Sequence, residues 1–321
     1  MKLPSLASLD EAARTVYAAM PPTPQIAWPL LGQRLGAEVW VKHENHTPVG
    51  AFKLRGGLVY FEQLKRTQPT VAGVVAATRG NHGQSIAFAA QRHGLHAVIV
   101  VPHGNSPAKN AAMRARGVEL IESGHDFQAA FDHAVKLADE RQLHLVPSFD
   151  GTLVRGVASC ALELLRAVPD LHTLYVPIGL GSGICGAIAA REALGLKTEI
   201  VGVTATAAPA YAESFEARRP IAAAVAPTIA DGLACRVPVP EALEVILRSV
   251  TRVVAVNEAE IRSALCDLFN DTHNVAEGAG AASLAALTKE RATQQGRRVA
   301  VILTGGNIDQ PVLADVLAQP T

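Results

Sequence analysis

The sequence predicts an α/β protein in which parallel sheets are flanked by helices. Three observations predict it: a high apolar content, short runs of β-branched residues, and helical segments that alternate with those runs. Hydrophobic residues make up 49% of the 321 residues and charged residues 18%, which is enough apolar material for a large core. This length allows one large domain or two ordinary ones.

In the first half, the strand and helix patterns alternate from residue 71 to residue 147. The expected strands are 71–78, 96–102, 118–123 and 143–147, and the expected helices are 82–94, 107–117 and 126–142. Short apolar runs separated by helices are typical of parallel strands joined by crossover helices.

The second half repeats this rhythm. Helices are expected at 159–168, 184–194, 258–272 and 280–296, and strands at 171–179, 199–205 and 298–307. No repeat period of 20 to 50 residues is present, which excludes a solenoid. Binding sites are expected where strands lead into helix N-termini.

Charge, cysteine usage and hydropathy exclude several classes of function. Lys plus Arg and Asp plus Glu both number 29, so no basic surplus is available for nucleic acid or an acidic membrane surface. The sequence contains no run of about 20 apolar residues that could span a membrane. These features predict a soluble, cytoplasmic protein. Its four scattered cysteines are expected to be buried free thiols: Cys160, Cys185, Cys235 and Cys266.

Two segments in the first half could carry chemistry. In the polar turn segment 43–57, Lys53 is flanked by small residues and Phe52, so it could lie against a flat cofactor and act as an amine nucleophile. On spacing alone, a solvated surface lysine is the commoner case. In the segment 78–85, a strand ends at Gly80 and a helix begins, which suits a carboxylate or phosphate. A simple helix cap at Asn81 explains this pattern equally well.

Two glycine-containing strand ends lie in the second half. The segment 177–186 places four glycines and a serine between a strand and a helix, which predicts a phosphate cradle. It fits GxGxxG only loosely and lacks the acidic residue expected about 20 residues later, so a small phosphate ester is favoured over a dinucleotide. At 303–309, Thr304 could face a ligand, although a structural turn is the alternative. Glu277 could be a site group or only a helix-dipole partner.

In order along the chain, these segments resemble the fold-type II pyridoxal-phosphate enzymes, in particular the threonine/serine dehydratase and serine racemase group. GAFKLRGG is similar to the family's SFKxRGA, RGNHGQS to SGNHxQ, PIGLGSGICG to VPxGGGGLxxG, and LTGGN to SGGN. The resemblance covers nearly the whole chain. It implies a two-domain fold like that of the tryptophan synthase β subunit, with a large domain at 1–65 and 146–321 and a small inserted domain at 66–145.

The resemblance also implies a role for each matching residue. Lys53 would form the Schiff base with pyridoxal 5'-phosphate, and Phe52 would pack against the ring. Asn81 would bind the ring hydroxyl, and Thr304 would meet the pyridine nitrogen. The phosphate would be wrapped by Gly179, Leu180, Gly181, Ser182 and Gly183. The substrate carboxylate would be held by the turn Thr78, Arg79, Gly80, Asn81 and His82.

The implied activity is that of a lyase, an ammonia-lyase that eliminates the β-hydroxyl of a β-hydroxy-α-amino acid of the L-threonine or L-serine type to give a 2-oxo acid and ammonia. Alternatives are a 3-hydroxyaspartate or 3-phenylserine dehydratase and a serine racemase-like enzyme. A non-catalytic amino-acid-binding protein is disfavoured by the intact Lys53. The partner is a small amino acid, and a homodimer is the expectation at the level of the family.

Several positions depart from the family pattern. Arg79 replaces the serine that racemases use on the second face, which argues against racemisation; it could bind a distal carboxylate or only form a surface ion pair. Thr204 and Ala210 stand where cation-activated members carry Glu and Asp, so no metal ion is expected. GVAS at 156–159 replaces GQGT, which leaves 3-phenylserine open. Little sequence follows LTGGN, so feedback inhibition through a regulatory domain is not expected.

Overall fold

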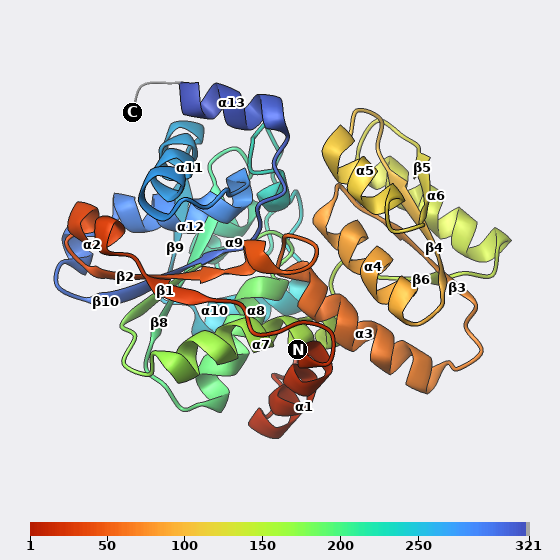
Figure 1. Ribbon diagram of the computed structural model, residues 1–321, viewed down its shortest axis with the longest axis horizontal. Coiled ribbons are helices and arrows are strands. Elements are labelled where there is room, and N and C mark those ends of the chain that lie inside the picture. Colours follow the sequence, from red (N-terminus) through yellow and green to blue (C-terminus); the bar gives the residue numbers. More distant parts are fainter. Residues whose placement is uncertain (319–321) are drawn as a thin grey trace.

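The computed structural model describes residues 1–318 and contains two sheets with helices on both sides of each (Figure 1). The strands are β1 (Gln25–Ala27), β2 (Glu38–His43), β3 (Gly73–Ala77), β4 (His96–Val101), β5 (Glu119–Glu122), β6 (His144–Leu145), β7 (Thr173–Pro177), β8 (Glu199–Ala205), β9 (Arg252–Val256) and β10 (Arg298–Leu303). The α-helices are α1 (Leu6–Tyr17), α2 (Pro29–Leu35), α3 (Lys53–Thr67), α4 (Asn81–Arg92), α5 (Pro107–Arg114), α6 (Phe127–Glu140), α7 (Gly151–Ala167), α8 (Ser182–Ala193), α9 (Ala210–Ala217), α10 (Pro240–Ser249), α11 (Glu258–Thr272), α12 (Gly278–Lys289) and α13 (Gln310–Ala318). Short 3₁₀ turns are η1 (Glu44–His46), η2 (Asp231–Leu233) and η3 (Arg291–Gln294).

The larger sheet has six strands in the order β1-β2-β10-β7-β8-β9. All of its pairings are parallel except that of β1 with β2. Alternate residues of β10 enter opposite cores: Ala300 and Ile302 pack with α7, α8 and α10, whereas Val299 and Val301 pack with α11 and α12. Because both faces of the sheet are buried, its strands are almost continuously apolar. Strands alternate apolar and polar residues only when one face of the sheet meets water.

The smaller sheet is fully parallel and has the order β5-β4-β3-β6. One face packs against α3, α4 and α5 and the other against α6. Figure 1 shows this unit to the right of the larger sheet, with α3 running between the two. All four strands lie within 66–145 and the six strands of the other sheet lie outside it, but α3 packs on both α4 and α7. The exact domain boundaries therefore stay a prediction.

Most of the predicted elements are present, and some have different limits. The strand at 199–205 and the helix at 258–272 are confirmed residue for residue. The helix expected from 159 instead begins at Gly151, because the Asp150 side chain accepts the backbone N–H of Thr152 and starts α7 earlier. The helix expected to reach 296 ends at Lys289, where a 3₁₀ turn follows.

The segment around Lys53 was expected to be a polar turn, which is wrong for its second part. Lys53 is the first residue of α3, a helix of 15 residues that the sequence analysis did not include. All four cysteines are buried and free. None of the helices in residues 1–318 has the length and apolar character needed to cross a membrane.

Candidate active site

The lysine segment is joined to the end of the last strand. The backbone N–H of Phe52 donates to the carbonyl of Thr304 at 2.9 Å, and Gly306 donates to the carbonyl of Gly50 at 2.9 Å. Ala51 also forms an antiparallel bridge with the residue after Thr304. Residues about 250 positions apart in sequence are thus fixed side by side at the carboxyl end of β10, the edge where parallel sheets usually bind ligands.

The Lys53 side chain lies between this segment and the glycine loop. Its Nζ atom donates to Ser182 Oγ at 3.1 Å and stands 5.1 Å from the centre of the Phe52 ring. Loss of hydration lowers the pKa of Lys53 to about 8. A larger fraction of the amine is therefore neutral near pH 8 than for a solvated lysine, which suits an amine that must act as a nucleophile or base.

The glycine loop connects β7 to α8 and brings backbone close to other segments. A Cβ atom on Gly179 would lie 2.3 Å from the carbonyl oxygen of Gly232, so only glycine fits there. Gly181 has a φ of 101°, in the left-handed region that favours glycine. The Tyr211 hydroxyl donates to the Leu180 carbonyl at 3.0 Å and fixes the loop. Helix α8 has no side-chain cap, so its first N–H groups are open to an anion.

Helix α4 begins after β3 with Gly80 as its N-cap residue, which has no side chain to cap the helix. The Thr78 hydroxyl accepts the backbone N–H groups of Gly80 at 3.0 Å and Gly83 at 3.3 Å, which shapes the turn. The backbone N–H groups of Asn81 and His82 form no hydrogen bond within residues 1–318. By contrast, five other helices are capped by a side chain: Ser5 for α1, Ser106 for α5, Asp126 for α6, Asp150 for α7 and Asn257 for α11.

His82 is buried beside Lys53. Burial lowers the pKa of His82 to about 3, and the charge of Lys53 contributes to this shift, so the imidazole is neutral at physiological pH. Its Nε2 atom has no hydrogen-bond partner among the described residues. A buried polar atom without a partner is uncommon in folded proteins and marks a place where a ligand or water would be bound.

A carboxylate, Glu277, faces the other side of Asn81. Its Oε1 atom accepts from Asn81 Nδ2 at 2.6 Å, and its Oε2 atom has no hydrogen-bond partner within residues 1–318. The ammonium group of Lys109 lies 3.5 Å from Oε2 and donates to Asp231 at 2.7 Å. Burial raises the pKa of Glu277 to about 7, against the opposing effect of Lys109. Burial alone would lower the pKa of Lys109, but Glu277 and Asp231 hold it above its usual value.

The structure brings together most of the residues that the sequence predicted. Lys53, Phe52, Asn81, His82 and Thr304 come from α3, α4 and the end of β10, and the loop from Gly179 to Gly183 meets them through Ser182. Arg79 differs, because its side chain is exposed.

Sequence analysis missed Lys109, Asp231 and Asn307 as members of this cluster, and it left Glu277 undecided. Each lies on a different element, and only tertiary structure brings them to Asn81. The local signal in the sequence was that Glu277 directly precedes a segment of small residues, which forms α12.

A family model described as "Pyridoxal-phosphate dependent enzyme" matches residues 16–305. The chain belongs to this family. Among curated proteins, an L-threonine ammonia-lyase from Geobacter sulfurreducens is 35% identical over 286 residues, which cover 89% of this chain and 71% of that protein.

Solved structures of the family agree with this fold. A maize serine racemase superposes with a TM-score of 0.91 at 26% identity and covers 98% of this chain and 97% of that one. The processed form of a threonine deaminase from Solanum lycopersicum superposes with a TM-score of 0.89 at 27% identity and covers 99% and 95%. The predictions of fold class, family and pyridoxal-phosphate cofactor are thereby confirmed.

The residues present fit the cofactor of this family. The open N–H groups of α8 and the Ser182 hydroxyl suit its phosphate, the Phe52 ring suits an aromatic ring, and the amine of Lys53 suits its aldehyde. The unpartnered atoms His82 Nε2 and Glu277 Oε2 lie beside the same region. Thr204 and Ala210 are both buried, and residues 1–318 contain no group of three or more His, Cys, Asp or Glu that could hold a metal ion. That the protein needs no metal ion stays a prediction.

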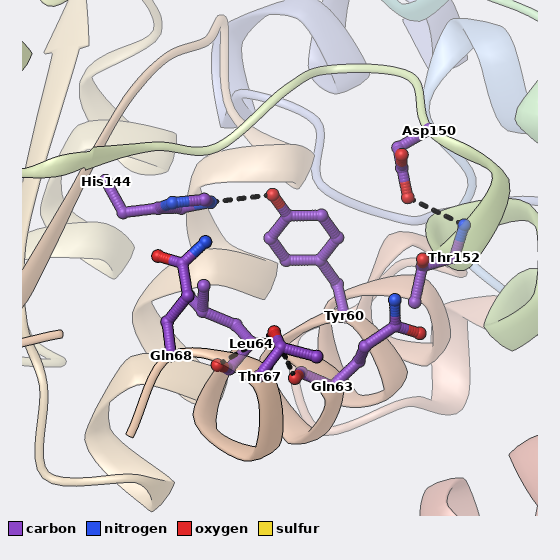
Figure 2. A pocket seen from close by; sticks show the side chains of 8 residues that line it. All are labelled: Tyr60, Gln63, Leu64, Thr67, Gln68, His144, Asp150 and Thr152. Carbon is purple, nitrogen blue, oxygen red and sulfur yellow. Dashed lines mark hydrogen bonds between the residues drawn. The ribbon is translucent and has the colours of Figure 1, made fainter. Parts of the chain in front are cut away.

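A separate pocket of about 190 Å³ lies farther along α3 (Figure 2). In it, the Tyr60 hydroxyl and His144 Nε2 are 2.8 Å apart and join α3 to β6. Its lining residues are Tyr60, Gln63, Leu64, Thr67, Gln68, His144, Asp150 and Thr152. None of these residues belongs to the cluster around Lys53.

Proposed function

We propose that this protein is a pyridoxal-phosphate dependent ammonia-lyase that converts a β-hydroxy-α-amino acid, by default L-threonine or L-serine, to a 2-oxo acid and ammonia. The observation that carries the proposal is the Lys53 amine, which has a lowered pKa and faces Ser182 at the start of α8. The predicted lyase class is confirmed by relatives named L-threonine ammonia-lyase, which are 32–35% identical to this chain.

Lys53 would hold the cofactor covalently, and the loop from Gly179 to Gly183, with Leu180, Gly181 and Ser182, would bind its phosphate. When bound, the cofactor draws electrons from the substrate and makes the hydrogen on the substrate Cα acidic. The amino group of the substrate would replace Lys53 on the cofactor, and the released Lys53 amine could take that proton, because its pKa of about 8 leaves a useful neutral fraction near neutral pH. Phe52 would pack on the ring, and Thr304 would meet the ring nitrogen.

The substrate carboxylate would be bound at the start of α4. In this proposal the backbone N–H groups of Asn81 and His82 are its donors, because Thr78 already occupies those of Gly80 and Gly83. Because the imidazole of His82 is neutral, the N-terminus of α4 would stabilise the negative charge of the carboxylate. Arg79 is exposed. It would bind a second, distal carboxylate only in a substrate that carries one, such as 3-hydroxyaspartate.

Other substrates and reactions remain as alternatives to this proposal. 3-Phenylserine is one, because residues 156–159 depart from the family pattern and Leu180 and Ser182 replace two glycines of its loop. Racemisation is favoured by the overall likeness to maize serine racemase, but Arg79 stands where racemases carry the second hydroxyl group. The cytoplasm as location and a homodimer as assembly belong to the same proposal.

The test is a substrate panel with matched lysine variants. Purified holoenzyme is incubated with L-threonine, L-serine, 3-hydroxyaspartate and 3-phenylserine, and release of 2-oxo acid and ammonia is measured. Lys53→Ala should abolish release, whereas Lys65→Ala, at the other end of α3, should leave it unchanged. Interconversion of enantiomers without 2-oxo acid would contradict the lyase proposal, and activity retained in Lys53→Ala would contradict the role of this lysine.

A further inference from the structure

The Asn81 side chain is held from both sides by residues of other elements. Its Nδ2 atom donates to Glu277 Oε1 at 2.6 Å, and its Oδ1 atom accepts from Asn307 Nδ2 at 2.9 Å. Asn307 Nδ2 donates its other hydrogen to the backbone carbonyl of Val49 at 2.9 Å. The result is a chain of hydrogen bonds that runs from Val49 through Asn307 and Asn81 to Glu277.

One end of this chain, a backbone carbonyl, can only accept, and this fixes the direction of every bond in it. The Val49 carbonyl can only accept, so the amide nitrogen of Asn307 must face it. The same nitrogen then faces Asn81, which must present its oxygen. The Glu277 oxygen at the other end accepts from the nitrogen of Asn81. A flipped Asn81 would set two NH₂ groups against each other at one end and two oxygens at the other.

The fixed orientation leaves one N–H group of Asn81 for a ligand. A primary amide has two N–H groups, and within residues 1–318 Asn81 uses one of them, toward Glu277. The Asn81 oxygen is already engaged by Asn307. Asn81 therefore meets a ligand as a donor and cannot readily turn to act as an acceptor.

We propose that Asn307 is a positioning residue which, together with Glu277, holds Asn81 as a permanent hydrogen-bond donor toward the ring oxygen of the bound cofactor. The inference rests on the proposed function, in which Lys53 holds the cofactor, and on the resemblance, which implies that Asn81 binds the ring hydroxyl. A fixed donor favours the ring oxygen in its anionic form, because N–H groups stabilise negative charge on an acceptor. If the Asn81 donor is lost, the anionic form of the ring oxygen is less favoured, and the bound cofactor should lose the corresponding proton only at a higher pH.

The experiment is a double-mutant cycle read by pH titration of the visible absorption of the bound cofactor. The proteins are wild-type holoenzyme, Asn81→Ala, Asn307→Leu and the double variant. Leucine is close to asparagine in size and adds no charge. Asn45→Leu is the control, because Asn45 donates to Asn274 at 3.0 Å in a second pair of asparagines. Near-UV circular dichroism checks the fold, and Asn307→Ser replaces Asn307→Leu if the latter does not fold.

We expect Asn81→Ala to raise the titration midpoint by about one pH unit, the size of one hydrogen bond to a charged group. Asn307→Leu should raise it by a similar or smaller amount, the double variant should match Asn81→Ala, and Asn45→Leu should match wild type. The inference is overturned if Asn81→Ala or Asn307→Leu leaves the midpoint unchanged, or if Asn307→Leu adds its own shift when Asn81 is absent. Absence of any cofactor band in wild type would instead overturn the proposed function, and this inference with it.

Discussion

Two clusters of polar and charged side chains lie near the start of α3, and they differ in how completely they are paired. In the first cluster, Arg55 is fully buried and donates to Glu44, Glu163, Ser159 and Thr23 at distances between 2.6 and 3.1 Å. A buried lysine, Lys42, donates to Glu163 in the same cluster. We call this group the anchor cluster.

The second cluster, which we call the site cluster, consists of Asn81, Glu277, Lys109, Asp231 and His82. Two of its buried polar atoms, on Glu277 and His82, have no hydrogen-bond partner within residues 1–318. Complete pairing suits a group that only has to hold α3 in place, because any unpaired buried charge would cost several kcal/mol. Incomplete pairing suits a group that is completed by a ligand. We propose that this difference distinguishes a structural cluster from one that binds a ligand.

The largest effect is expected from breaking the anchor cluster. Arg55→Met would leave Glu44 and Glu163 buried without their cation, so the free energy of unfolding should fall by about 3–5 kcal/mol. Urea denaturation measures it. The control is Arg114→Met, because Arg114 pairs with Glu122 at the surface and its loss should cost about 1 kcal/mol or less. Equal losses in the two variants would contradict the distinction between anchor and surface charges.

A smaller, pH-dependent effect is expected from Glu277 in the site cluster. Burial raises the pKa of its carboxyl group from 4.5 to about 7, so the folded protein holds this proton to a higher pH than the unfolded chain does. The stabilisation is therefore complete below pH 4.5 and is lost as the pH rises through about 7. In wild type the free energy of unfolding should fall by up to about 3 kcal/mol across this pH window, from 4.5 to about 7, and in Glu277→Gln this fall should be absent. Urea denaturation of the cofactor-free protein from about pH 5 to pH 8 measures it, and parallel pH profiles would contradict it.

Lys109 should modulate the same titration. Its ammonium group opposes the effect of burial on Glu277, so Lys109→Met should raise the pKa of Glu277 further and move the upper end of the window up by about one pH unit. The same denaturation series measures this shift. A downward shift would show that Lys109 does not stabilise the ionised carboxylate.

The smallest effect, no change at all, is expected on adding a divalent cation. Thr204 at the end of β8 and Ala210 at the start of α9 offer no carboxylate where the resemblance places the cation ligands of activated members. Initial rates of EDTA-treated holoenzyme, measured with and without Mg²⁺ or Ca²⁺, should therefore agree. A clear increase on adding either ion would contradict the prediction.

Local patterns were sufficient for those parts of the site that are contiguous in sequence. The glycines of the loop at 179–183, the turn around Asn81 and the end of β10 at Thr304 each combine a strand end with small residues, and tertiary structure brings all three to Lys53. The parallel strands were predictable for a related reason, since burial on both faces leaves long β-branched runs.

Long-range pairing could not be predicted from the sequence. Arg55 lies two residues after Lys53 in a polar stretch, yet its partner Glu163 is 108 residues away on α7, so no local signal distinguishes it from a surface arginine. The same holds for Lys109 and Asp231, which are 122 residues apart. Helix α3 was missed because its first residues, Lys-Leu-Arg-Gly-Gly, are typical of a turn, and its packing on α4 and α7 outweighs that preference.

In the proposed function Lys53, and no other lysine, holds the cofactor. Reduction of the holoenzyme with borohydride, followed by proteolysis and mass spectrometry, identifies the amine directly. We predict that the cofactor-derived mass is found on the peptide that contains Lys53. Its presence on Lys42 or Lys109, both of which are paired with carboxylates, or its absence from every lysine-containing peptide, would contradict the account.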